Sequence, residues 1–327
     1  MGQHQRFYEL QRRDRPFIGL LRWLPAGALA LVLAALSPAA AEKVPDESLP
    51  MRRHEALRME LTRALRIDSQ AKDGTAGPDH PLAEVLRYAH EQFGNAAAGV
   101  RDYRCTLIKR ERVGGRLQEY RAMDLTIRNP RVSDAGAEVP FGVYLKFTYP
   151  AGTKGREALY VAGKNHGNLL ATKGGNGLLR DVTRSLSPES PQLKEGTNYP
   201  VTEIGILNLF ERLIEDGIQH VTIDSRRECQ VIRSDDGKIN NRPCHVIQVT
   251  FPRHREGIRF HRAQIFFDPA LGVPVRYAAY SWPPSPGAPA PLLEEFTYVN
   301  VKLNVGLTDR DFDRENPMYG FYNQDER

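Results

Sequence analysis

The residues whose chemistry depends most on spacing are the three cysteines and the nine histidines. The sequence contains no C-x-x-C, H-x-x-x-H or H-E-x-x-H, which are spacings that dedicated zinc sites use. His254 and His261 stand seven residues apart, and we expect them in solvated loops rather than on a metal ion. The sequence therefore predicts no metal site and no cofactor.

Signals for an enzyme are equally sparse. The serine-hydrolase pattern G-x-S-x-G is absent, and the glycine-rich run at residues 174–177 lacks the Lys-Ser/Thr of a phosphate loop. Glu157, Glu203, Glu294 and Glu295 could form a pair of catalytic carboxylates, but nothing in the sequence fixes their separation. We expect a protein that is not an enzyme, with a hydrolase whose catalytic residues meet only in the fold as an alternative.

Two of the cysteines are placed symmetrically about a turn signal. Asp236-Gly237 is a favoured two-residue hairpin turn, and Cys229 and Cys244 each lie seven residues from it. Residues at equal distance from a hairpin turn face each other, so we predict a disulfide between them. A loop lengthened by Lys238–Asn241 is the alternative, and Cys105 is expected to be a small buried side chain.

A run of four charges lies inside a predicted strand. In Lys109-Arg110-Glu111-Arg112, successive side chains point to opposite faces, so Arg110 or Arg112, or else Glu111, points inward. An inward charge needs a partner, because an unpaired buried charge is costly. A second basic group, at residues 253–262, could contact lipid headgroups at a membrane surface or form a solvated hairpin end.

The net charge of +5 is concentrated in the N-terminal segment. Residues 1–41 carry five basic and two acidic side chains, so the remainder is nearly neutral and offers no field for nucleic acid. The apolar run Leu24–Leu36 follows Arg22 and precedes Ala39 and Ala41, a pattern typical of a cleaved signal peptide. We predict a signal peptide at 1–41 and a periplasmic or secreted protein, with an uncleaved membrane anchor at Phe17–Leu36 as the alternative.

The rest of the chain divides into a linker and one domain. Residues 42–81 are predicted to be a linker with a candidate peripheral helix, marked by Leu57, Leu61 and Leu65. In the domain, 82–327, one helix begins at Pro81, and a second has Thr202 as its N-cap and ends at Gly217. Strands with a period of two fill the intervening and following segments.

The proportions of these elements decide the fold class. About ten strands at ~4.8 Å spacing make a sheet nearly 50 Å wide, whereas two helices cover only a few strands. We therefore expect an α+β fold, a curled antiparallel half-open β-barrel with two packing or lid helices. Such a fold can enclose an apolar cavity, although a fully packed core is the alternative. The cavity residues predicted from the pattern are Val143, Leu145, Phe147, Tyr160, Phe210, Ile265, Phe267 and Tyr277.

Several segments resemble a known family. Asp102–Gly115 (DYRCTLIKRERVGG), Pro140–Gly167, Tyr199–Glu215 and Phe266–Trp282 are similar to an uncharacterised family of exported bacterial proteins, the domain-of-unknown-function 1571 family. More distantly, the order of helix, meander, helix and closing strands is similar to the LolA-like periplasmic lipoprotein-carrier superfamily. That resemblance implies a half-open barrel with helices as a lid and an apolar cavity for acyl chains.

Together these observations favour an exported, non-enzymatic protein that binds a lipid or the acyl chain of a lipoprotein, as a carrier or a sensor. The helix Thr202–Asp216 would serve as its lid. The alternative is a structural or regulatory module that docks another envelope protein through residues 42–80 and the basic loop, without a lipid ligand.

Overall fold

The computed structural model describes residues 49–70, 79–174, 182–194 and 196–321. The predicted signal peptide lies outside these residues. No helix among them combines the length and the apolar character needed to cross a membrane.

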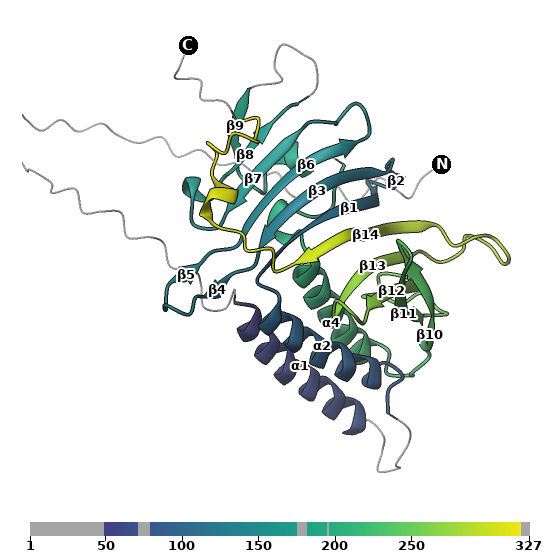
Figure 1. The fold of residues 1–327 in the computed structure, drawn as a ribbon. Helices are drawn as coiled ribbons and strands as arrows, with labels where there is room; N and C mark the ends of the chain where they lie inside the picture. The colour runs from purple at the N-terminus through teal and green to yellow at the C-terminus, as the bar shows by residue number, and fades with distance from the viewer. Residues whose placement is uncertain (1–48, 71–78, 175–181, 195, 322–327) are drawn as a thin grey trace, which may run out of the picture. The chain divides into compact units, whose positions relative to one another are not determined.

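A large antiparallel sheet dominates the structure and gives it an α+β fold, as predicted (Figure 1). Its strand order is β10-β11-β12-β13-β14-β1-β3-β6-β7-β8-β9, with β2 paired to β1, so β10 and β9 are its two edges. The strands are β1 (Asp102–Val113), β2 (Arg116–Leu117), β3 (Arg121–Arg128), β6 (Gly142–Tyr149), β7 (Glu157–Val161), β8 (Leu169–Thr172), β9 (Thr183–Leu186), β10 (Gln230–Ile239), β11 (Arg242–Thr250), β12 (Arg262–Asp268), β13 (Val273–Tyr280) and β14 (Leu292–Leu303). Strands β4 (Arg131–Val132) and β5 (Glu138–Val139) form a separate small hairpin.

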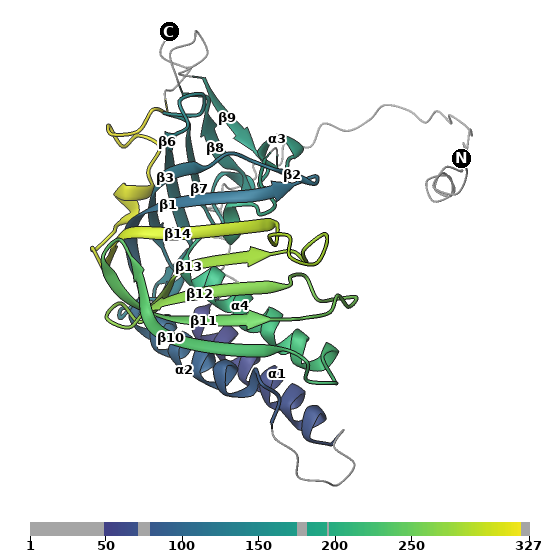
Figure 2. The same cartoon turned by 90° about the vertical axis from the view of Figure 1, so that its right-hand side faces the viewer.

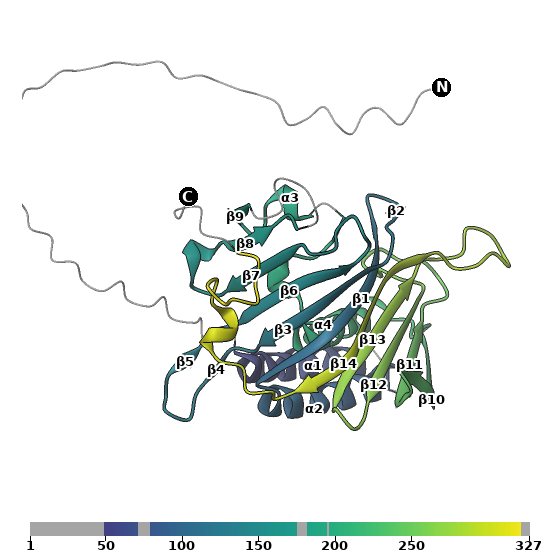
Figure 3. The same cartoon turned by 45° about the horizontal axis from the view of Figure 1, so that its top comes forward.

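The chain's two meanders meet in the middle of the sheet, where β14 pairs with β1. The sheet curves around helix α4 (Ile206–Ile223), and we call the face that carries α4 the inner face (Figures 2 and 3). Alternation along β1 turns Tyr103, Cys105 and Leu107 toward this face, and all three are buried in the main core. The opposite face is covered locally by the C-terminal segment, where Phe312 packs with Tyr144.

Helices α1 (Pro50–Gln70), α2 (Ala83–Gly99) and α4 pack against one another, and α3 (Pro191–Lys194) is a single turn (Figure 1). Helix α4 is amphipathic, and its buried stripe includes Ile206, Phe210 and Ile214. It begins after Gly205 rather than at Thr202, and it continues through Gly217 to Ile223. The predicted end at Gly217 is therefore wrong: a glycine inside a helix costs only ~1 kcal/mol, and here it lies against Leu86 of α2.

Helix α1 occupies the segment expected to be a linker with a peripheral helix. Leu57 and Leu61 are buried in the main core, and the guanidinium of Arg53 pairs with Glu211 and Glu215 of α4. The helix is thus part of the packed body, where it lies against α2 and α4.

The predicted disulfide is wrong, because the hairpin turns elsewhere. The turn between β10 and β11 falls at Asn240-Asn241, both with positive φ, while Gly237 lies in β10 beside a bulge and faces Cys244. Cys229 precedes β10, far along the ladder from Cys244. All three cysteines are free and buried.

Candidate functional site

Helix α4 crosses the inner face and leaves a cavity on each side. The helix cavity, enclosed by α2, α4 and strands β11–β13, has a volume of about 80 Å³. The loop cavity, enclosed by residues 197–205, α4 and strands β1, β3, β6, β7 and β14, has a volume of about 140 Å³. The two differ in chemistry as well as in size.

The helix cavity is lined almost wholly by apolar side chains. Leu86 and Val85 of α2, Phe210 of α4, and Ile265 and Phe267 of β12 form most of its wall. Phe210 packs at 6.1 Å from Phe267, ring centre to ring centre. This arrangement offers a surface for hydrocarbon and little for a polar ligand.

A histidine is buried at one end of the helix cavity. The His220 ring lies edge-on to Phe251 and Phe260, at 5.0 and 5.2 Å between ring centres. Its Nε2 has no hydrogen-bond partner in the described part of the chain. Burial lowers the pKa of His220 to about 4, and the nearby Arg259 acts in the same direction. The imidazole is therefore neutral at pH 7.

The loop cavity combines an apolar floor with a charged rim. Leu107, Met123, Leu145 and Phe296 contribute to its floor. Four charged side chains also line it: Lys109, Arg121, Glu203 and Arg212. Such a cavity can take a ligand that is apolar at one end and charged at the other.

One buried carboxylate behind the cavity wall ties the loop to the sheet. The buried Glu111 carboxylate lies 2.5 Å from the Lys109 Nζ and accepts hydrogen bonds from the Asn198 amide (2.9 Å) and the Thr197 hydroxyl (3.2 Å). Burial lowers the pKa of Lys109, and Glu111 opposes that shift. Glu111 and Lys109 are thus the inward charges of the four-residue run, whereas Arg110 turns outward and stacks over Tyr120.

A second carboxylate repeats this arrangement on β14. The Tyr199 hydroxyl donates to the buried Glu294 at 2.8 Å, and the Arg212 guanidinium lies 3.8 Å over the Tyr199 ring. Burial raises the pKa of Glu294, while the hydrogen bond from Tyr199 lowers it. Glu111 and Glu294 together hold the loop that closes this cavity.

The structure separates the eight predicted cavity residues into groups. Leu145 and Phe147 line the loop cavity, and Phe210, Ile265, Phe267 and Tyr277 line the helix cavity. Val143 is fully buried in the core and Tyr160 packs near Phe141; neither lines either cavity. The sequence reasoning missed Lys109, Arg121 and Arg212. The strand alternation that identified Glu111 could have found Lys109, two residues away on the same face.

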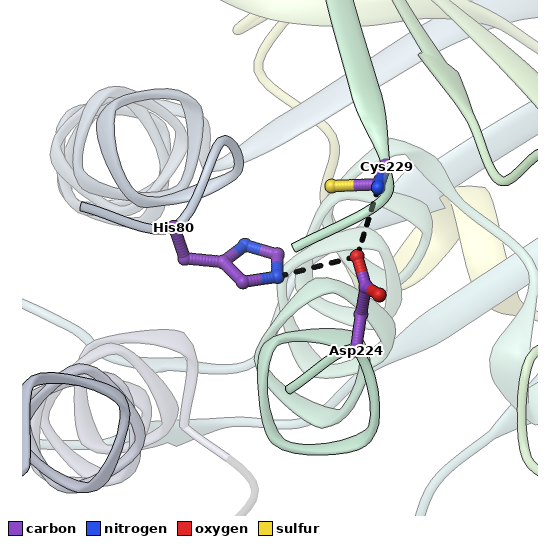
Figure 4. A group of neighbouring side chains, drawn as sticks. All are labelled: His80, Asp224 and Cys229. Carbon is purple, nitrogen blue, oxygen red and sulfur yellow. Dashed lines mark hydrogen bonds and ion pairs between the residues drawn. The ribbon is translucent and has the colours of Figure 1, made fainter. Parts of the chain in front are cut away.

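A third group, outside both cavities, has residue types that can ligate a metal. His80, Asp224 and Cys229 are buried, and one ligand atom from each lies within 4.8 Å of the others (Figure 4). The Asp224 carboxylate accepts the Cys229 amide at 2.9 Å and lies 3.6 Å from His80 Nε2. The Leu82 amide donates to His80 Nδ1 at 3.2 Å.

The hydrogen bonds of this group indicate that His80 and Cys229 keep their protons and do not ligate a metal ion. Because Nδ1 accepts the Leu82 amide, the neutral ring carries its proton on Nε2, the atom that faces Asp224. Burial, with Asp224 nearby, raises the pKa of the Cys229 thiol to about 12, and Arg255 brings a cation within 3.6 Å of the carboxylate. The group is suited to fastening the end of α4 to the start of α2.

Comparisons with known proteins find solved structures of low sequence identity. No curated protein matches the chain. Among solved structures, a DUF1329 family protein from Desulfovibrio piger is 12% identical with a TM-score of 0.33, covering 71% of this chain and 97% of its own. A putative outer membrane lipoprotein-sorting protein domain from Vibrio parahaemolyticus is 11% identical with a TM-score of 0.31, covering 70% and 96%. A LolA superfamily protein from Nitrosomonas europaea is 9% identical with a TM-score of 0.26, covering 65% and 90%.

A family model also matches the chain. The model described as "Protein of unknown function (DUF1571)" matches residues 100–321, from the start of β1 to the C-terminal segment on the outer face. This range includes both carboxylates that hold the loop and all of α4. The chain belongs to the DUF1571 family.

Proposed function

We propose that the protein is an exported, non-enzymatic binding protein that holds the acyl chain of a lipid or lipoprotein between α4 and the inner face of the sheet. The observation that carries this proposal is the pair of cavities along α4. Protein interiors are otherwise packed with few voids larger than a water molecule, so cavities of about 80 and 140 Å³ are spaces that a ligand could use.

The size of the cavities suggests how a chain would enter. An apolar cavity of ~150 Å³ takes a molecule the size of benzene, so each cavity as it stands takes only a segment of an acyl chain. Leu209 of α4 lines the loop cavity and its neighbour Phe210 lines the helix cavity. A displacement of α4 would therefore join the two spaces, and the curved sheet would act as a half-open barrel with α4 as its lid.

The proposal predicts that filling either cavity weakens binding. Ala158 lines the loop cavity and Ala263 the helix cavity, so Ala158→Leu and Ala263→Leu each remove space from one side. The exposed Ala137, in the turn between β4 and β5, provides a matched control in Ala137→Leu. Binding is measured by titrating the purified protein with a fluorescent fatty acid.

We expect saturable uptake by the unaltered protein and by Ala137→Leu, and at least tenfold weaker uptake by each cavity variant. Native mass spectrometry of protein purified from its own envelope should show a bound lipid. Absence of uptake by the unaltered protein would overturn the proposal, and so would two cavity variants that bind as the unaltered protein does.

A further inference from the structure

A wider groove opens beside the loop cavity. It has a volume of about 530 Å³ and is lined by residues of β7, β8, β9 and α3. The groove and the loop cavity share Arg121, Phe147, Ala158 and Leu193 in their walls. The apolar floor of the loop cavity therefore continues, past the Arg121 side chain, into a surface groove.

This groove is strongly basic. Its wall includes four cationic side chains: Arg121, Arg156, Lys173 and Arg184. Glu157 is the acidic residue among the described residues of the wall, and its carboxylate is already paired with Lys146 at 2.9 Å and accepts the Gly320 amide at 2.7 Å. The positive charge of the groove is thus not balanced within its own described wall.

Arg121 stands where the groove and the cavity meet, opposite another cation. In the β1–β3 ladder it is the direct partner of Lys109, and like charges in that position destabilise a sheet. Glu111 neutralises Lys109. No carboxylate of the described residues forms an ion pair with Arg121, whose guanidinium lies against the backbone of Gly196.

Building on the proposed function, we propose that the ligand is a single-chain amphiphile with an anionic headgroup, either a carboxylate or a phosphate. Its hydrocarbon chain enters the loop cavity, and its headgroup pairs with Arg121 and with the exposed cations of the groove. An arginine guanidinium matches both headgroups, because each presents two oxygens to its parallel N–H donors. The anion would also relieve the repulsion between Arg121 and Lys109.

The test compares ligands that share one chain. Dodecanoate, dodecyl phosphate and dodecanol are titrated into the purified protein by calorimetry at low salt, together with inorganic phosphate. We expect both anionic amphiphiles to bind at least tenfold more tightly than dodecanol, and inorganic phosphate to bind far more weakly than dodecyl phosphate. In Arg121→Met the two anionic amphiphiles should bind no more tightly than dodecanol does to the same variant, whereas Arg121→Lys should retain most of the preference.

One control and one second test variant keep the result interpretable. Arg116→Met removes an exposed arginine of β2 outside the groove and should change nothing. If Arg121→Met does not fold, Arg184→Met decides: this exposed groove residue should contribute about a threefold loss in dodecanoate affinity and none for dodecanol.

The outcomes separate this inference from the proposed function. Equal affinity for all three amphiphiles would overturn the anionic headgroup and leave the acyl-chain proposal standing. Binding of none of them would overturn both. Inorganic phosphate that binds as tightly as dodecyl phosphate would also overturn the inference, because the site would then recognise an anion without a chain.

Discussion

The two cavities along α4 share a helix and a sheet, yet they are closed by different means. A second helix, α2, closes the helix cavity through packed apolar side chains such as Leu86 and Val85. A loop closes the other cavity, and two buried carboxylates, Glu111 and Glu294, hold that loop in place. One side therefore depends on packing and the other on charge.

This difference indicates which side opens more readily. Separating α2 from α4 would expose a continuous apolar surface, at ~25 cal/mol for each Å². Releasing the loop requires breaking a few polar contacts, and an incoming charged group can replace them. We therefore expect the ligand to enter on the side of the loop cavity. The helix cavity is then the space into which side chains, or the far end of the ligand's acyl chain, can move.

The largest predicted loss of stability comes from breaking the ion pair that holds the loop in place. Glu111→Gln leaves the Lys109 ammonium buried without its carboxylate, and removal of one partner from a buried ion pair typically costs about 3–5 kcal/mol. We expect a loss of that size in the free energy of unfolding, measured by urea denaturation. The matched control is Glu84→Gln on α2, which removes an exposed pair with Arg233 and should cost less than ~1 kcal/mol.

If Glu111→Gln and Glu84→Gln lost equal stability, the ion pair would not be what holds the loop. The double variant Lys109→Met/Glu111→Leu sharpens the test. It removes both charges and should recover most of the loss, because no unpaired charge is left inside.

The second prediction concerns pH on the apolar side. An unfolded histidine titrates near pH 6.5, whereas burial lowers the pKa of His220 to about 4. Between these values the unfolded chain binds a proton that the native protein does not, so stability falls as the pH is lowered from 6.5 to 4. The contribution of this one group is roughly 3 kcal/mol. His220→Phe should flatten the dependence of unfolding free energy on pH by that amount.

Unfolding at pH 7, 5.5 and 4 measures this contribution. The exposed Ala137 provides the control, because Ala137→Leu changes no titratable group and should leave the pH dependence unchanged. A His220→Phe curve parallel to that of the unaltered protein would contradict the assignment of His220 as a neutral member of the apolar wall.

The architecture was largely predictable because it depends on local alternation. Period-two segments gave the antiparallel strands, and the spacing of Leu82 and Phe93 gave α2. The choice of turn was not predictable: Asp236-Gly237 and Asn240-Asn241 both have turn chemistry, and no local pattern selects between them. The cysteine pairing failed with that choice.

The candidate site was predictable to the extent that it depends on one strand. Because alternate side chains of a strand point to opposite faces, only some of the charges at residues 109–112 could point inward. Glu111 is one of these, and it is buried. The division into two cavities depends instead on the path of α4 over the sheet and on the packing of α1. Those contacts join residues far apart in the chain, such as Arg53 with Glu211, and no local pattern encodes them.

The smallest predicted effect compares glycine-to-alanine substitutions at two positions, one just before α4 begins and one inside the helix. Gly205 lines the loop cavity at φ 131°, and a Cβ there would meet the Tyr103 hydroxyl at 2.9 Å. Tyr103 is fully buried, and its hydroxyl accepts the Ile206 amide, so it cannot move freely. Gly205→Ala should therefore cost about 1–3 kcal/mol of unfolding free energy.

Gly217 lines the helix cavity, and a Cβ there would meet Leu86 Cδ2 at 2.5 Å. Leu86 borders the cavity, so its end can rotate into empty space, and replacing glycine in a helix gains ~0.5–1 kcal/mol. Gly217→Ala should therefore change stability by less than ~1 kcal/mol in urea denaturation. Equal losses for the two variants would mean that the helix cavity cannot receive a displaced side chain, and the far end of an acyl chain would then have no space there either.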